Sequence, residues 1–249
     1  MNSASFVKQC HSFVLVHGAF HGAWCWAPVV SHLRSKGHIV HTPTQTGLAD
    51  RKHLMSRDID METFVLDVLN VIESEELSEV ILVGHSYGAR SITGVVDRIP
   101  QRIARLVYLD GGIPMDGRSR LDATPEPARS QRIESALKFD GGISVPPPPA
   151  EAFGVTDPQL ADWVNRRVTP QPFGAEKTPV RLQNPIGNGR PATYVRCINP
   201  PFPSVAASAE YAKRQPGWRY IEFPGCHDAI LTHPVDIADL LIAEAGLAE

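Results

Sequence analysis

Short hydrophobic runs alternate with longer amphipathic stretches along most of the chain. The run at 79–83 (Glu-Val-Ile-Leu-Val) is typical of a buried strand, and apolar residues recur with 3.6-residue spacing at 60–75, which predicts a helix packed on a sheet. Alternation of this kind indicates βα units and predicts an α/β fold with a mainly parallel sheet of about six strands flanked by helices. The predicted strands are 12–17, 38–41, 79–83, 105–109, 193–197 and 218–223, and the predicted helices are 24–36, 60–75, 87–98, 204–214 and 235–245.

The alternation is interrupted between residues 114 and 191. This stretch holds 13 of the 22 prolines, four of them consecutive at 146–149, and shows only weak helical pieces such as 159–167. It is too long for an ordinary loop. We therefore predict a core made of residues 1–112 and 192–249, interrupted by a Pro-rich cap or lid insertion at 113–191 that is held by stiff, irregular chain rather than by long helices.

Composition excludes several classes of protein. The chain of 249 residues has 24 Lys+Arg against 27 Asp+Glu, a formal net charge of -3, which argues against a nucleic-acid-binding protein. No run approaches the roughly 18 apolar residues of a membrane span, and residues 1–9 make a poor signal peptide, so we expect a cytoplasmic protein that binds no membrane. Four scattered cysteines are expected to be free thiols, and no metal or cofactor motif is present.

A candidate nucleophile lies between a predicted strand and a predicted helix. Residues 84–88 read Gly-His-Ser-Tyr-Gly and match the G-x-S-x-G pattern. The pattern alone is weak, but a tight strand-to-helix turn is the context that a nucleophile elbow requires. Glycines two residues on either side of Ser86 remove the Cβ atoms that would clash in such a turn. Ser86 is thus predicted to stand at the positive end of the following helix.

Three motifs together resemble the α/β-hydrolase superfamily. They are residues 16–24 (Val-His-Gly-Ala-Phe-His-Gly-Ala-Trp), 84–88, and 225–228 (Gly-Cys-His-Asp). More narrowly, the chain is similar to the small group of esterases and hydroxynitrile lyases that includes plant methyl-salicylate esterases and bacterial relatives. The resemblance implies that the backbone N–H groups of Ala19 and Tyr87 form an oxyanion hole.

The general base is selected by its position in the chain. A serine hydroxyl needs a base within hydrogen-bond reach, and in this fold the order is Ser, acid, His, with the His after the last strand. His227 fits that position. His233 is the competitor, but it lies immediately before Pro234 and the last predicted helix, where a capping role is more natural.

The acid is harder to assign. In the resembled group it usually follows the penultimate strand, but the stretch 197–201 (Cys-Ile-Asn-Pro-Pro) has no carboxylate and offers only Asn199. Asp110 ends the strand one place after the elbow, where some lipases of this superfamily keep their acid, and it is our prediction. Asp228, next to His227, is expected to point elsewhere.

The substrate is expected to lie between the elbow and the insertion, because ligands bind above the carboxyl ends of the strands in such sheets. The loop at 42–53 is expected to be solvated. His17 and His21 are expected to be structural or pocket-lining. Candidate substrate-binding residues are Gly18, Phe20, Trp24, Phe139 and Trp163, with further apolar wall from Tyr87, Phe153 and Phe173.

These observations predict a carboxylesterase-type serine hydrolase that cleaves a small ester through Ser86, His227 and Asp110, with no cofactor. Amide or carbamate hydrolysis uses the same machinery and stays open. Hydroxynitrile lyases of the group have Thr in place of Gly18 and Lys in place of Asp228, so that activity is disfavoured. A ligand receptor with a vestigial site is the remaining alternative, and either a monomer or a homodimer is compatible with the sequence.

Overall fold

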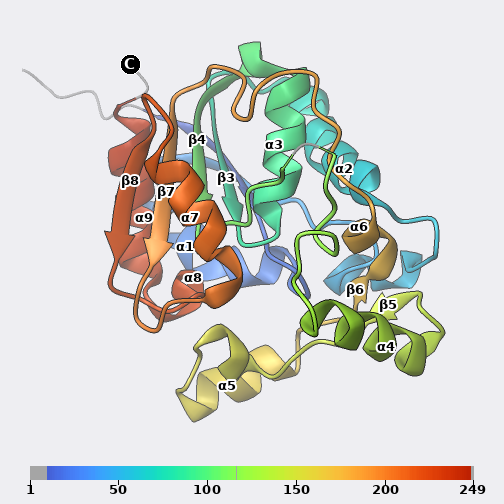
Figure 1. Ribbon diagram of the computed structural model, residues 1–249. Coiled ribbons are helices and arrows are strands. Elements are labelled where there is room, and N and C mark those ends of the chain that lie inside the picture. Colours follow the sequence, from blue (N-terminus) through green and yellow to red (C-terminus); the bar gives the residue numbers. More distant parts are fainter. Residues whose placement is uncertain (1–9, 116, 248–249) are drawn as a thin grey trace, which may run out of the picture.

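A computed structural model of the chain describes residues 10–115 and 117–247, and its centre is a six-stranded parallel sheet (Figure 1). The strand order is β2-β1-β3-β4-β7-β8, with all neighbouring pairs parallel. The predicted mainly parallel sheet of about six strands is confirmed. The strands are β1 Ser12–Val16, β2 Ile39–His41, β3 Val80–His85, β4 Ile103–Leu109, β7 Ala192–Cys197 and β8 Arg219–Phe223.

Helices cover both faces of the sheet (Figure 1). All six residues of β3 are buried, because alternate side chains pack into different hydrophobic clusters: Leu82 with helices α2 and α3, and Ile81 with α1 and α9. Helix α2 begins with a capping box in which the Asp60 carboxylate accepts the backbone N–H of Thr63. The helices are α1 Ala27–Ser35, α2 Met61–Ser74, α3 Gly88–Arg98, α4 Ala128–Asp140, α5 Pro158–Asn165, α6 Phe173–Lys177, α7 Ala206–Lys213, α8 Ala229–Thr232 and α9 Pro234–Ala245, with short 3-10 turns such as Ala23–Trp26 before α1.

The chain between β4 and β7 folds into elements of its own. Helices α4 and α5 and the antiparallel pair β5 (Ser144–Val145) and β6 (Gln171–Pro172) lie beyond the carboxyl ends of the strands, while α6 packs beside α2 (Figure 1). The weak helical piece predicted at 159–167 corresponds to α5. Helix α4, with 13 residues, corrects the expectation of irregular chain without long helices. It was missed because Ala136 is its only fully buried residue, so its sequence shows little apolar periodicity.

Residues 44–48 of the loop after β2 are mostly buried, which corrects the expectation of a solvated loop for this part, whereas Asp50, Lys52 and His53 are exposed. The side chains of Thr44 and Gln45 are buried, and the Gln45 amide donates a 2.5 Å hydrogen bond to Ser91 Oγ on α3. Asp67 on α2 accepts hydrogen bonds from Thr46 N (2.6 Å) and Thr46 Oγ1 (2.8 Å). Polar residues predicted a surface segment, but their partners lie within the fold.

The cysteines and the lengths of the apolar helices can be compared with the expectations from composition. All four cysteines are free thiols, as predicted. Among residues 10–115 and 117–247, no helix is long and apolar enough to cross a membrane.

Candidate active site

Ser86 occupies a strained turn between β3 and α3. Its φ is 51°, in the left-handed region that a residue with a side chain rarely adopts. A Cβ at Gly84 would lie 2.8 Å from the backbone N of Ala89, and a Cβ at Gly88 would lie 2.6 Å from the carbonyl O of Val16, so the turn requires glycine at both positions. The side chain of Ser86 is partly exposed. The geometry is that of the predicted nucleophile elbow.

His227 lies in the turn after β8 and contacts the serine. Its Nε2 is 2.8 Å from Ser86 Oγ, and its side chain is 3% exposed. The ring stacks on Phe202, with ring centroids 3.8 Å apart, and lies 6.4 Å from the ring of Phe153. The competing His233 instead places its Nδ1 2.8 Å from Thr232 Oγ1 and precedes α9.

Phe202 is a contact of the site that sequence reasoning missed. It lies in the stretch after β7 where the family usually keeps its acid, and it packs flat against the imidazole of His227 instead. The pair of prolines before it was the only local signal of an unusual turn. Nothing in the sequence pattern distinguished this aromatic side chain from an ordinary core residue.

Asp110 holds the other nitrogen of the same imidazole. It follows β4, is completely buried, and its Oδ2 lies 2.6 Å from His227 Nδ1. Its second oxygen accepts hydrogen bonds from Arg196 Nη1 (2.8 Å) and from the backbone N–H of Cys197 (3.2 Å). Asn199 is exposed, and its backbone N–H donates to Gly225 O. Of the two acid candidates, only Asp110 contacts the histidine.

The loop after β1 lies close to Ser86. A Cβ added at Gly18 would lie 2.9 Å from Ser86 Cβ and 3.4 Å from Ser86 Oγ, so the backbone before Ala19 is closely apposed to the serine. Phe20 adopts a positive φ of 69°, and its backbone N–H is held by Gln171 Oε1 at 3.0 Å. Tyr87, the residue after the serine, precedes α3.

The close approach at Gly18 gives a steric prediction. We expect Gly18→Ala to lower kcat/KM for a short ester by about 100-fold, because the added methyl must displace Ser86 and a 1 Å misplacement of reacting groups has an effect of that size. The measurement is steady-state kinetics beside Gly246→Ala, a control at an exposed glycine with a φ of -64° where an added Cβ meets only ordinary contacts. Unchanged kinetics of Gly18→Ala would show that the loop is not held against the serine.

A second, buried His–Asp pair lies beside the first. Asp228 Oδ2 is 3.1 Å from His21 Nε2, and both side chains are almost fully buried. Burial alone would raise the pKa of Asp228, but the imidazole of His21 lowers it below its usual range. Burial alone would lower the pKa of His21, but Asp228 raises it. Asp228 therefore points away from the Ser86 hydroxyl, as expected, and pairs with a residue of the first motif.

His17 is neutral in the folded protein. Its Nδ1 donates to Gly18 O (2.8 Å) and its Nε2 accepts the backbone N–H of Gln45 (3.0 Å), an arrangement that only the neutral ring can satisfy. Burial lowers the pKa of His17 to about 4. The ring has a structural role, joining the loop after β1 to the loop after β2.

This depressed pKa predicts a loss of stability in acid. The unfolded chain takes up the His17 proton below about pH 6.5, whereas the folded protein takes it up only near pH 4, so the contribution is present above pH 6.5 and is lost as the pH falls. Between pH 7 and pH 5 the wild type should lose about 2 kcal/mol more free energy of unfolding than His17→Gln. Urea unfolding at both pH values measures the difference, and equal losses would contradict a neutral His17.

Four of the candidate pocket aromatics are connected by ring contacts through His21, whose ring lies 5.1 Å from that of Phe153. Trp24 packs against His21 (centroids 5.1 Å apart) and against Trp163 (5.2 Å), while Phe20 lies 6.3 Å from Phe153. These contacts join the loop after β1 to the segment between β4 and β7, and buried Phe173 belongs to the same cluster as Phe20.

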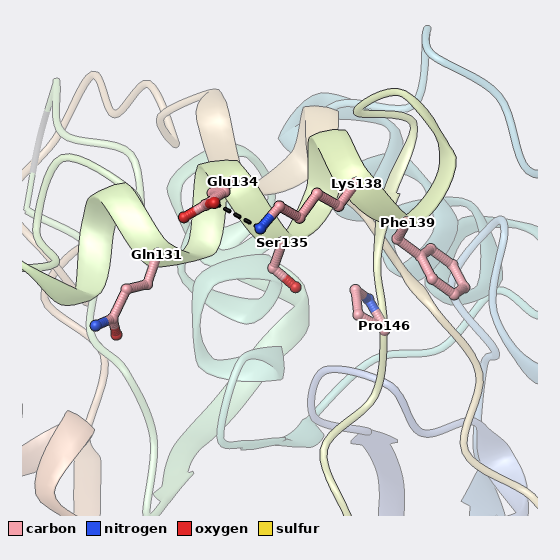
Figure 2. A pocket seen from close by; sticks show the side chains of 6 residues that line it. All are labelled: Gln131, Glu134, Ser135, Lys138, Phe139 and Pro146. Carbon is pink, nitrogen blue, oxygen red and sulfur yellow. Dashed lines mark ion pairs between the residues drawn. The ribbon is translucent and has the colours of Figure 1, made fainter.

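Phe139 is placed elsewhere, contrary to expectation. It is 49% exposed at the end of α4 and lines an open surface pocket with five other residues, as Figure 2 shows. Among the described residues, no ring contact joins it to the aromatic side chains near Ser86. The periodicity of α4 was too weak to indicate which face Phe139 occupies. The other lining residues are Gln131, Glu134, Ser135, Lys138 and Pro146.

Comparisons with known proteins agree with this architecture. Residues 13–240 match the alpha/beta hydrolase family, and the chain belongs to that family. It is 38% identical over 242 residues to the carbendazim hydrolyzing esterase of Nocardioides sp., covering 93% of this chain and 98% of that one. It is 39% identical over 108 residues to methylesterase 4 of Arabidopsis thaliana, a match that spans only 40% of the plant protein.

Solved structures give the same result. An extracellular alpha/beta-hydrolase from Paenibacillus, described as homologous to tobacco salicylic acid binding protein 2, superposes with a TM-score of 0.80 at 25% identity, covering 94% of this chain and 98% of that chain. Methylketone synthase I from tomato shares the fold, with a TM-score of 0.79 at 19% identity over 97% of this chain and all of that one. Within the alpha/beta hydrolases, the chain is a hydrolase of the carboxylesterase type.

Proposed function

We propose that the protein is a serine esterase that cleaves a small carboxylic ester through an acyl-enzyme formed on Ser86. Two hydrogen-bonding contacts carry the proposal. Asp110 Oδ2 lies 2.6 Å from His227 Nδ1, and His227 Nε2 lies 2.8 Å from Ser86 Oγ. A nucleophile in contact with a base that is itself oriented by a carboxylate is the arrangement that activates a serine.

The reaction proceeds in two halves. Ser86 Oγ attacks the ester carbonyl while its proton passes to His227 Nε2; the resulting imidazolium then gives this proton to the departing alcohol oxygen. Water next attacks the acyl-enzyme, its proton passing to the same nitrogen and returning to Ser86 Oγ as the acid leaves. Phe202 stacks on the imidazole at 3.8 Å and restrains its ring plane during both transfers.

Asp110 stabilises the imidazolium between these transfers. Its Oδ2 accepts the His227 Nδ1–H, which fixes the tautomer that leaves Nε2 free to act as base. Arg196 and the Cys197 amide both donate to the second oxygen, which holds the buried carboxylate in the orientation that reaches His227.

The backbone N–H groups of Ala19 and Tyr87 form the oxyanion hole in this proposal. The close approach of Gly18 to Ser86 supports that assignment for the loop after β1, and the position at the amino end of α3 supports it for Tyr87. Losing one such donor costs about 10²- to 10³-fold in kcat in comparable enzymes.

Residues 113–191 act as the cap over a core of 1–112 and 192–249, with Phe20, Trp24 and Trp163 at their junction.

Amide or carbamate hydrolysis is the second candidate, because the same groups would perform it. The name of the Nocardioides relative makes carbendazim one substrate to test. The alternatives of lyase and receptor are weaker. Against the lyase, Asp228 pairs with His21 at the position where the lyases have Lys. Against the receptor, Asp110 contacts His227, so the site has the carboxylate that a vestigial site would lack.

The experiment is hydrolysis of p-nitrophenyl esters of increasing chain length, with carbendazim and a matching p-nitroanilide alongside. We expect ester turnover that exceeds anilide turnover. Ligand binding to a folded protein without turnover of any substrate would support the receptor instead.

We further propose a cytoplasmic location.

A further inference from the structure

A cluster of arginine side chains surrounds one buried carboxylate next to the proposed active site. Arg90 comes from α3, Arg132 from α4, and Arg120 from the chain before α4; the carboxylate is Glu176 on α6. All three guanidinium groups lie close enough to act electrostatically on both Glu176 and Tyr87. The cluster therefore joins the insertion to helix α3, which begins two residues after Ser86.

The charges in this cluster do not balance. Glu176 is completely buried, and Arg132 binds both of its carboxylate oxygens in a fork. Burial alone would raise the pKa of Glu176, but the guanidinium groups of Arg132, Arg120 and Arg90 lower it. One carboxylate therefore faces three guanidinium groups, which leaves a surplus of two positive charges in a largely enclosed place.

Arg90 is the member without a matching acceptor. Its side chain is 5% exposed, and its Nη1 is buried without a hydrogen-bond partner among residues 10–115 and 117–247. Its Cζ lies 6.0 Å from the ring centroid of Tyr87, a weak contact for a full charge. A buried donor left unsatisfied is costly, and arginine does not lose its proton in proteins. A buried guanidinium in this state is able to bind an acceptor brought by a ligand.

Two contacts tie the cluster to residues beside Ser86. The Cζ of Arg90 lies 6.0 Å from the ring centroid of Tyr87, the residue that follows Ser86. The Cζ of Arg132 lies 5.6 Å from the ring centroid of Phe20, the residue after the proposed oxyanion donor Ala19. A molecule with its ester carbonyl at Ser86 could place a second polar group among these arginines.

We propose that Arg90, with Arg120 and Arg132, binds the carboxylate of the substrate, and that the enzyme prefers mono-esters of dicarboxylic acids. The inference rests on the serine-esterase function proposed above and specifies its substrate class. A carboxylate matches the planar fork of a guanidinium, supplies the acceptor that Arg90 Nη1 lacks, and reduces the surplus charge from two to one. A neutral ester can offer an acceptor oxygen, but it brings no negative charge and no bidentate match to the guanidinium.

The test compares monomethyl and dimethyl esters of a series of diacids from succinate to suberate. At pH 7 the free carboxyl of each mono-ester is ionised. The ratio of kcat/KM for the mono-ester to that for the diester should peak at one chain length in the wild type. Arg90→Met should lower this ratio about 10- to 100-fold, the range expected for losing a hydrogen bond to a charged group, and Arg90→Lys should retain part of it.

Two further variants keep the test decisive. Arg34→Met removes an equal charge from an exposed position on α1 and should leave the ratio unchanged. If Arg90→Met does not fold, Arg120→Gln, at a partly exposed position, should lower the same ratio. The free diacid of the preferred length should also inhibit p-nitrophenyl acetate hydrolysis competitively in the wild type.

The outcomes separate this inference from the proposed function. Hydrolysis of p-nitrophenyl acetate with no preference for any mono-ester would overturn the carboxylate site and leave the esterase intact. Equal losses for mono-ester and diester in Arg90→Met would assign the arginine a structural role and likewise overturn it. Failure to hydrolyse any ester, p-nitrophenyl acetate included, would count against the esterase itself.

Discussion

Ser86→Ala should lower kcat for a p-nitrophenyl ester by about 10⁶-fold, the loss found when a triad serine is removed from a comparable enzyme. The reason is chemical: alanine has no oxygen to form the acyl-enzyme, although His227 and the backbone amides of the site remain. The protein should stay folded, because Ser86 Oγ makes no contact that the core requires beyond that with His227. Steady-state and single-turnover kinetics measure the loss.

The matched control removes a serine hydroxyl from a surface helix. Ser35→Ala, at the exposed end of α1, should retain wild-type kinetics. His227→Ala should lose almost as much activity as Ser86→Ala, and the double variant should lose little more, because the two groups act as one unit. Additive losses would show that the serine and the histidine work independently.

Asp110→Asn should lower kcat by up to about 10⁴-fold, by analogy with the same change in a serine-protease triad. The amide can still touch His227 Nδ1, but it cannot stabilise the imidazolium, and it can favour the tautomer that has its proton on Nε2. Two hydrogen bonds from Arg196 and Cys197 would meet a neutral side chain, so some loss of stability should accompany the loss of activity.

Asn199→Ala is the informative comparison. Asn199 lies where the family usually keeps its acid, but its side chain is exposed, so activity should be unchanged. Melting temperatures of both variants keep folding effects separate from catalytic ones. If Asn199→Ala lost activity and Asp110→Asn kept it, the acid assignment would be wrong.

The positions of Ser86, His227 and Asp110 could be predicted from the G-x-S-x-G turn and from the resemblance to the α/β-hydrolase superfamily, and the topology of a parallel sheet explains why they meet. Each of these residues follows a strand that was predicted from the sequence, and β3 and β4 are neighbours with continuous register from Ile81 to His85. The carboxyl ends of the strands therefore gather at one edge, where side chains distant in sequence come together.

Other parts of the fold left no such signal. The orientation of Phe202 depends on the path of an irregular turn after β7, which residue spacing does not specify. Helix α4 buries only Ala136, so its stability comes from contacts such as that of Arg132 with Glu176 rather than from an apolar stripe. Gln45 appeared to belong to a solvated loop because sequence pattern does not reveal that Ser91 and His17 are its partners.

Reaction of the protein with a fluorophosphonate probe, followed by peptide mass spectrometry, tests the central claim most directly. The probe reports on an activated serine without any assumption about the substrate. The account predicts a single adduct on Ser86 that is absent in Ser86→Ala and greatly slowed in His227→Ala. A folded wild-type protein that fails to react, or that reacts at another residue, would contradict it.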